Sequence, residues 1–187
     1  MTLSTYEPPA LEIRLTLALG LTVLSPYYHA FARSLKLRGD ERVLDFGSGS
    51  GICSRHIAAR LKDGGHLACV DISHGWMDVV RHTLSNFTNV SYHVGRITEL
   101  DLPASSFDAV VMHFVLHEIP VAERQEVVSA LARLLKPGGR LMVREPQGHG
   151  LTRGDLNHLA AAAKLHPFAF SSRNIVISSV YDAEYTL

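Results

Sequence analysis

A glycine-rich turn between an apolar run and a helical pattern constrains the fold of this chain more than any other feature. Residues 43–46 have the composition of a short β-strand, and residues 47–51 read Gly-Ser-Gly-Ser-Gly. An apolar spacing typical of a helix follows, at Ile52, Ile57 and Leu61. A strand that turns through glycines into a helix is typical of a parallel α/β sheet, where backbone must approach a ligand closely.

The rest of the chain repeats this alternation of β-rich runs and amphipathic helical stretches. Strands are predicted at residues 43–46, 67–72, 90–94, 109–113 and 140–145. Two more are predicted at residues 174–180 and 184–187 around a tight turn at residues 181–183, which implies an antiparallel pair. The predicted fold is α/β: a Rossmann-like, doubly wound seven-stranded sheet, mostly parallel with an antiparallel edge strand, and with helices on both faces.

The composition indicates one soluble globular domain. The chain has 187 residues, 47% of them hydrophobic and 19% charged, and its 18 basic side chains balance 18 acidic ones, so no nucleic-acid partner is expected. Cys53 and Cys69 fall inside predicted elements, as expected of reduced thiols in a cytoplasmic protein. The apolar run at residues 15–24 is too short to span a bilayer and follows Glu7 and Glu12, which argues against a secretory leader or a membrane span.

The residues around the glycine turn favour a ligand that carries a positive charge. A nicotinamide or flavin site would have glycine or alanine where Ile52 stands. The carboxylate of Asp45 would repel a pyrophosphate but hold an ammonium group, directly or through water. Asp71, at the end of the second predicted strand, is placed to accept hydrogen bonds from both hydroxyls of a ribose.

With three later segments, these residues resemble class I S-adenosylmethionine-dependent methyltransferases. Residues 105–111, 115–119 and 134–140 look like the family's later motifs and occur in the family's order. The most similar group is the small-molecule methyltransferases that include the quinone-biosynthesis C-methyltransferases. The resemblance implies a methyltransferase domain at residues 41–187, a helical cover over the active site at residues 1–40, and S-adenosyl-L-methionine as cofactor. The reaction implied is transfer of a methyl group to a small-molecule acceptor by in-line displacement.

The resemblance also implies a set of cofactor-binding residues, with one departure from the family pattern. The set is Asp45, Gly47, Ser48, Gly49, Gly51, Asp71, Ile72, Arg96, Ile97 and His113. The family usually has Gly-Asp after the third strand, where the acid meets the adenine amino group, but here Gly95 is followed by Arg96. Arginine cannot accept that hydrogen bond. Two interpretations stay open: a solvated side chain, or a contact with an anion such as a substrate carboxylate.

Four side chains are candidates for a catalytic role on the acceptor. They are His117, Tyr27, His29 and Glu145. Each also has a purely structural interpretation, and a base is needed only when the acceptor atom arrives protonated. The neighbouring His113, His117 and Glu118 lack the His-Glu-x-x-His order of a zinc helix, so no metal is expected.

Two other functions stay open on the sequence alone. One is a non-catalytic binding or scaffold subunit that keeps the fold, which Arg96 favours and the intact Asp45 and Asp71 oppose. The other is a nicotinamide-dependent reductase, whose glycine spacing is absent. Among methyltransferases, amino-methylation of DNA or glutamine is disfavoured because residues 113–116 do not read Asn/Asp-Pro-Pro-Tyr, and two cysteines disfavour arsenic methylation. The sequence is compatible with a homodimer.

Overall fold

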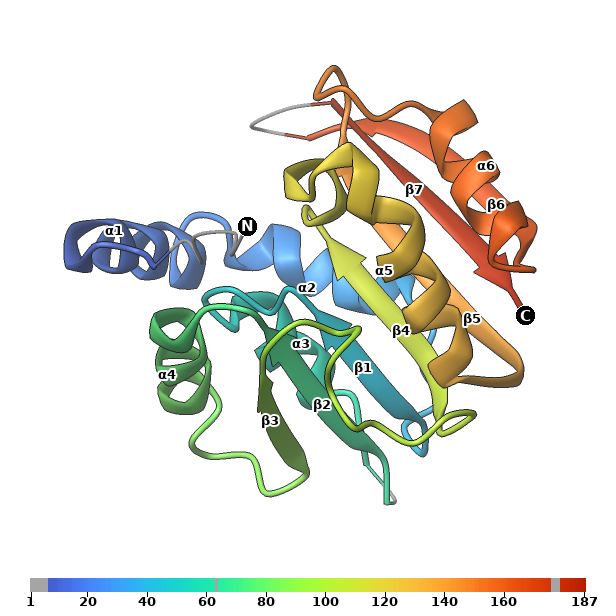
Figure 1. Cartoon of the computed structure of the whole chain (residues 1–187). Helices are drawn as coiled ribbons and strands as arrows, with labels where there is room; N and C mark the ends of the chain where they lie inside the picture. Colours follow the sequence, from blue (N-terminus) through green and yellow to red (C-terminus); the bar gives the residue numbers. More distant parts are fainter. Residues whose placement is uncertain (1–6, 63, 176–178) are drawn as a thin grey trace. The chain divides into compact units, whose positions relative to one another are not determined.

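The computed structural model describes residues 7–62, 64–175 and 179–187, and these residues fall into two compact units divided between Arg96 and Ile97. Each unit contains strands flanked by helices (Figure 1). The described parts of the chain contain seven strands, in the order β3-β2-β1 in the first unit and β4-β5-β7-β6 in the second. The predicted Rossmann-like sheet of mixed, mostly parallel strands is confirmed.

The first unit is built on three parallel strands. These are β1 (Arg42–Phe46), β2 (His66–Asp71) and β3 (Val90–Val94), with Val43 opposite Leu67 and Leu67 opposite Val90. Helices α3 (Ile52–Ala58) and α4 (His74–Thr83) connect them and pack on the strands. The central strand β2 is almost completely buried, which explains its continuous apolar sequence.

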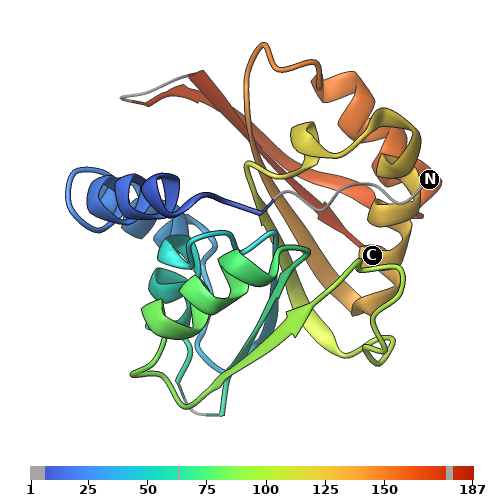
Figure 2. The same ribbon diagram turned by 60° about the vertical axis from the view of Figure 1, so that its left-hand side comes forward.

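Two helices precede the strands, where the sequence predicts helices. They are α1 (Ala10–Leu21) and α2 (Ser25–Ser34); α2 packs against α3, and α1 packs against both (Figure 2). Helix α2 begins at Ser25 with proline in its first turn and ends at Ser34. In the described residues no single helix is long and apolar enough to cross a membrane, whereas α1 and α2 together pass that test with a bend of 69° between them.

The second unit has four strands with mixed directions. Strand β4 (Phe107–His113) is parallel to β5 (Leu135–Pro146), and β5 is antiparallel to β7 (Ser179–Thr186), which is antiparallel to β6 (His166–Asn174). The 3-10 helix η1 (Leu116–Glu118) and helix α5 (Val121–Leu134) connect β4 to β5, and α6 (Arg153–Ala162) follows β5. Helices α5 and α6 lie side by side in both ribbon views (Figures 1 and 2).

The prediction of the last two strands is wrong in its boundaries. Residues 181–183, predicted as a turn, lie inside β7, and the first strand of the pair is His166–Asn174. Strand β7 alternates between buried and partly exposed side chains, and Asp182 occupies a partly exposed position where it pairs with Arg144. Strand β6 is exposed along its whole length, so it lacks the apolar alternation that marks a half-buried strand in a sequence.

Candidate functional site

The glycine turn of the first unit is anchored to the end of β2. The backbone N–H groups of Gly47 and Ser48 donate to the carbonyl of Val70 at 2.8 and 3.1 Å. Gly49 has φ +50°, and a Cβ at this position would meet no atom within 4 Å. The backbone of Gly49 therefore borders open space, in a conformation that a side chain would strain. Such a turn leaves room for a ligand to contact the backbone directly.

Asp71 lies beside this turn and is held by backbone donors. Its Oδ2 accepts from the N–H of Gly49 at 2.8 Å, and its Oδ1 accepts from the N–H of Ser73 at 2.9 Å. Burial raises the pKa of Asp71, and these backbone hydrogen bonds partly offset the effect. The backbone of Ile72 also contributes a hydrogen bond to this carboxylate, and since a carboxylate has about four acceptor positions, capacity for a further donor remains. The side chain of Ile72, the next residue, is 44% exposed.

Asp45 lies deeper than the sequence suggests. It is 2% exposed, and its Oδ2 accepts a hydrogen bond of 2.5 Å from the hydroxyl of Ser54. Burial raises the pKa of Asp45 to about 6; the bond from Ser54 opposes this shift, and the charge of Asp71 adds to it. Ser54 was not identified from the sequence as a partner of Asp45. Its position in the first turn of the helix after the glycines could have indicated this role.

Glu7 is a further contributor to this region that the sequence did not reveal. Its carboxylate accepts hydrogen bonds from the hydroxyl of Ser73 at 2.7 Å and from the backbone N–H groups of His74 and Gly75 at 3.0 and 2.8 Å. These donors belong to the beginning of α4, where a negative charge is favourable. The same carboxylate contributes to the raised pKa of Asp71. Glu7 thus links the N-terminal segment to α4, the helix that follows Asp71.

In the second unit, His117 and Glu145 form a hydrogen-bonded pair. The Nδ1 of His117 lies 2.6 Å from Oε2 of Glu145, whose side chain is fully buried, while the His117 side chain is 17% exposed. The other oxygen of Glu145 accepts from the backbone N–H groups of Val115 and Leu116 at 3.1 and 2.7 Å. Because the carboxylate of Glu145 is an acceptor, Nδ1 of His117 donates to it, and Nε2 is the ring nitrogen that does not contact Glu145. The buried carboxylate thus holds the orientation of the imidazole ring.

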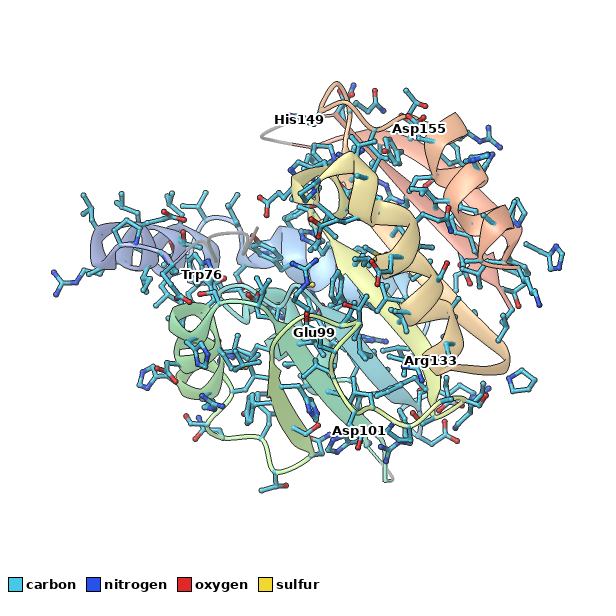
Figure 3. All side chains as sticks on the ribbon, viewed as in Figure 1. Trp76, Glu99, Asp101, Arg133, His149 and Asp155 are labelled. Atoms are coloured by element: carbon cyan, nitrogen blue, oxygen red, sulfur yellow. The ribbon has the colours of Figure 1, made fainter. Side chains whose placement is uncertain are left out.

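Arg124 and His149 complete the surroundings of this pair. Arg124 is 7% exposed and donates to the carbonyls of Ile119 and His117 at 2.8 and 3.0 Å, and to that of Gly150 at 3.5 Å. It therefore links the loop after β4 to the loop after β5, which carries His149 (Figure 3). The rings of His117 and His149 meet edge to face with centroids 5.4 Å apart. No sequence pattern marked Arg124.

The remaining predicted site residues have varied surroundings. The ring of Tyr27 lies against Tyr28, and the exposed His29 lies 5.6 Å, centroid to centroid, from His56 of α3. Burial, followed by the charge of Arg144, lowers the pKa of His113 to about 3, so this imidazole is neutral at neutral pH.

Arg96 and Ile97 stand at the division between the two units. Arg96 is half-buried and Ile97 is buried. The roles predicted from the sequence for these residues, and for all the other catalytic and cofactor-binding candidates, stay predictions.

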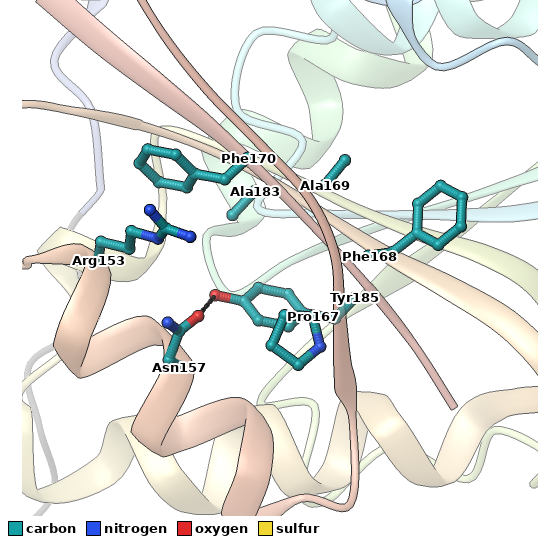
Figure 4. A pocket seen from close by; sticks show the side chains of 8 residues that line it. All are labelled: Arg153, Asn157, Pro167, Phe168, Ala169, Phe170, Ala183 and Tyr185. Carbon is teal, nitrogen blue, oxygen red and sulfur yellow. Dashed lines mark hydrogen bonds between the residues drawn. The ribbon is translucent and has the colours of Figure 1, made fainter.

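A shallow pocket in the second unit lies between α6 and the β6–β7 hairpin (Figure 4). Its volume is about 110 Å³, and the hydroxyl of Tyr185 donates to Oδ1 of Asn157 across it at 2.9 Å. Ligand sites usually have volumes of about 300–1,000 Å³, so this pocket is too small for a nucleoside. Within the described residues no three His, Cys, Asp or Glu side chains are grouped to hold a metal ion.

Comparison with known proteins agrees with this geometry. Residues 43–139 match the family described as a methyltransferase domain, which is about half of the chain. The chain belongs to this methyltransferase family. The chain is 34% identical over 134 residues to the demethylmenaquinone methyltransferase of Tropheryma whipplei (strain Twist), which is 71% of this chain and 53% of that protein. It is 33% identical over 111 residues to the ubiquinone/menaquinone biosynthesis C-methyltransferase of Vibrio campbellii, covering 58% and 42%. The chain thus spans about half the length of these relatives.

Solved structures share the fold of this chain. A SAM-dependent methyltransferase from Aquifex aeolicus has a TM-score of 0.78 at 14% identity, covering 96% of this chain and 99% of that one. Geranyl diphosphate C-methyltransferase from Streptomyces coelicolor, in complex with S-adenosyl-L-homocysteine, has a TM-score of 0.69 at 14% identity, covering 84% and 75%. The predictions of family and fold are confirmed.

Proposed function

We propose that this chain transfers a methyl group from S-adenosyl-L-methionine to a small-molecule acceptor. The observation that carries the proposal is the arrangement of Asp71 and the glycine turn, where the Gly49 N–H binds one carboxylate oxygen and open space borders the glycine. This arrangement suits a ribose, and the buried Asp45 supplies a negative charge near the turn for an ammonium group. When bound, the cofactor supplies an electrophilic methyl group, and membership of the methyltransferase family supports this choice.

Calorimetry tests the cofactor, and an activity assay tests the transfer. Binding of S-adenosyl-L-homocysteine with no binding of a nicotinamide dinucleotide is the expected result. Failure of S-adenosyl-L-homocysteine to bind would contradict the proposal. Binding without any turnover on a broad acceptor panel would favour the non-catalytic alternative.

For the acceptor we propose a quinone-type ring methylated on carbon. The support is the resemblance to relatives named as demethylmenaquinone and ubiquinone/menaquinone methyltransferases. A short-chain demethylmenaquinone in its reduced form is the first acceptor to assay, beside simple phenols, amines and thiols as alternatives. Methyl transfer only to an amine or thiol would contradict the proposed acceptor.

The chain's contribution on the acceptor side is assigned to His117 and Glu145. We propose that Nε2 of His117 removes the proton from the acceptor and that Glu145 holds the ring in the required tautomer. A hydroxyl or a carbon-bound hydrogen requires such a base, whereas a neutral amine does not. Tyr27 and His29, on the N-terminal helix α2, are proposed to line the acceptor side, as the resemblance implies. The protein is further proposed to be cytoplasmic, and it is compatible with a homodimer.

Replacing Asp71 by alanine is expected to weaken the binding of S-adenosyl-L-homocysteine about tenfold to a hundredfold. Hydrogen bonds to a charged acceptor are worth about 1.5–3 kcal/mol, and the substitution removes those of the ribose. Calorimetry measures the dissociation constant, with the exposed Asp78 replaced by alanine as the matched control. An unchanged dissociation constant would count against the role of Asp71.

The affinity for S-adenosyl-L-homocysteine is expected to fall as the pH drops below about 6. The pKa of Asp45 is raised to about 6, so above this pH the carboxylate is ionised and attracts the ammonium group, and below it the neutral acid does not. The decrease approaches about tenfold per pH unit if only the ionised form binds. Calorimetry between pH 5 and 8 measures it, and Asp45→Asn should bind weakly at pH 8 with a flatter curve. A curve for this variant parallel to that of the unaltered protein would contradict the assignment.

A further inference from the structure

Exposed apolar side chains are concentrated in one short segment at the N-terminal helix. Of the ten large hydrophobic side chains that are exposed among the described residues, five lie within residues 11–23. They are Leu11, Leu15, Leu19, Leu21 and Val23, with exposed fractions from 42% to 69%. Single exposed apolar residues are normal in soluble proteins, but a cluster on one element indicates an interaction surface.

The geometry of α1 holds these side chains outward. Leu11, Leu15 and Leu19 follow one another at intervals of four residues, which places them on the same face of the helix. The opposite face carries the buried Gly20, and a Cβ at this position would clash with the side chain of Ile52 in α3. Gly20 thus faces α3 within the first unit, where α1 packs against α2 and α3 (Figures 1 and 2). We call Leu11, Leu15 and Leu19, with the neighbouring exposed Leu21 at the end of α1 and Val23 just after it, the leucine face.

We infer that the leucine face docks on the surface of a lipid bilayer, with α1 lying in the plane of the membrane. Helix α1 has 12 residues, a length of about 18 Å at 1.5 Å per residue, against about 30 Å for a hydrocarbon core. It can therefore lie at the interface without spanning. Its side chains include one acid, Glu12, and one base, Arg14, so the attraction does not depend on anionic lipid. The exposed Arg14 can extend its guanidinium to the headgroups while its stem covers apolar surface.

A second copy of the chain fits this face less well. The apolar accessible surface of one aliphatic side chain is roughly 60–120 Å², so the five side chains together expose at most about 600 Å². A stable protein–protein interface buries about 800 Å² on each partner. Helix α1 also contains no aromatic side chain, and aromatic residues supply most strong anchors of protein interfaces. A bilayer needs neither a minimum area of matched shape nor such anchors.

The test is flotation of the full chain with vesicles of phosphatidylcholine alone. The unaltered protein should float with the vesicles, and adding phosphatidylserine should change the bound fraction by less than twofold. The double variant Leu15→Glu/Leu19→Glu should lower the partition coefficient at least tenfold, because two charges would enter the interface. The matched control is Val121→Glu, since Val121 is 75% exposed and lies at the start of α5, outside the leucine face.

Circular dichroism and thermal melting establish that each variant is folded. Should the double glutamate variant fail to fold, Leu15→Ala/Leu19→Ala keeps the helix propensity, and its partition coefficient should fall at least threefold. The inference is overturned if the unaltered protein does not float with phosphatidylcholine vesicles, or if Val121→Glu lowers the partition coefficient as much as the double variant. It is also overturned if light scattering finds a dimer that Leu15→Glu/Leu19→Glu dissociates while vesicles bind neither protein, which would assign the face to a second copy.

Discussion

Replacement of Asp182 by alanine is expected to lower the free energy of unfolding by about 3–5 kcal/mol, the usual cost of breaking a buried ion pair from one side. Asp182 and Arg144 are opposite one another on β7 and β5, and both carboxylate oxygens accept from the guanidinium, at 2.5 and 2.7 Å. The side chain of Arg144 is only 2% exposed. The guanidinium therefore loses two hydrogen bonds in a region of low dielectric.

Glu184 provides a matched control for this prediction. It pairs with Arg140 across the same two strands at 3.0 Å, and its exposed fraction of 21% is close to the 22% of Asp182. One difference lies in the cations, because the Arg140 side chain is 28% exposed. Asp182 also pairs with Arg173 at 2.9 Å, but the Arg173 side chain is 48% exposed, so this second pair adds little. Glu184→Ala should cost about 1 kcal/mol or less. Urea unfolding followed by circular dichroism measures both variants, and equal losses would contradict the special role of the buried Arg144.

Replacement of His117 by alanine is expected to lower kcat by about 10²–10⁴-fold, the usual contribution of a positioned general base. The dissociation constant of S-adenosyl-L-homocysteine should change little, because the groups proposed to bind the cofactor belong to Asp45, Asp71 and the glycine turn. Stopped assays of methyl transfer to the reduced demethylmenaquinone acceptor, together with calorimetry, separate the two effects. The control is His158→Ala, an exposed histidine on α6, which should keep kcat within about twofold.

Glu145→Gln tests the orienting role of the carboxylate in the same assay. Glutamine has a similar shape, but it cannot accept at both oxygens, and the amide that faces Nδ1 of His117 favours the wrong tautomer. We expect kcat to fall about a hundredfold or more, with an intact fold, by analogy with other carboxylate–histidine pairs. A full rate in either His117→Ala or Glu145→Gln would mean that the acceptor loses its proton elsewhere or does not carry one.

The strands and helices that build the cofactor region could be predicted because their signals are local. An apolar run, a series of glycines and a helical spacing occupy consecutive residues, so periodicity determines each element before any tertiary contact forms. The failure at the C-terminal hairpin has a physical cause. Strand β6 is exposed along its length, so it carries no buried face to pattern its sequence, and Asp182 resembles a turn residue although it is the partner of Arg144.

The candidate site was predictable in its chemical types but not in its pairings. Asp45 and Asp71 follow from their position at strand ends, whereas the bond from Ser54 to Asp45 depends on which face α3 turns toward β1. His117 and Glu145 were both named from the sequence as catalytic candidates, but their contact with one another was not predicted. Their hydrogen bond joins residues 28 positions apart, on η1 and β5.

The sequence by itself determined the order of the elements, the glycine turn, the two acids beside it and the membership of a methyltransferase family. Tertiary structure alone decided that Glu145 holds His117, that Arg124 links the loops around this pair, and that Glu7 caps α4. It also decided that Gly20 of α1 is buried next to Ile52, whereas Leu11, Leu15 and Leu19 stay exposed. The reason is that local periodicity states only which face of an element is apolar, while the partner of a side chain depends on strand register and helix packing between segments distant in the chain.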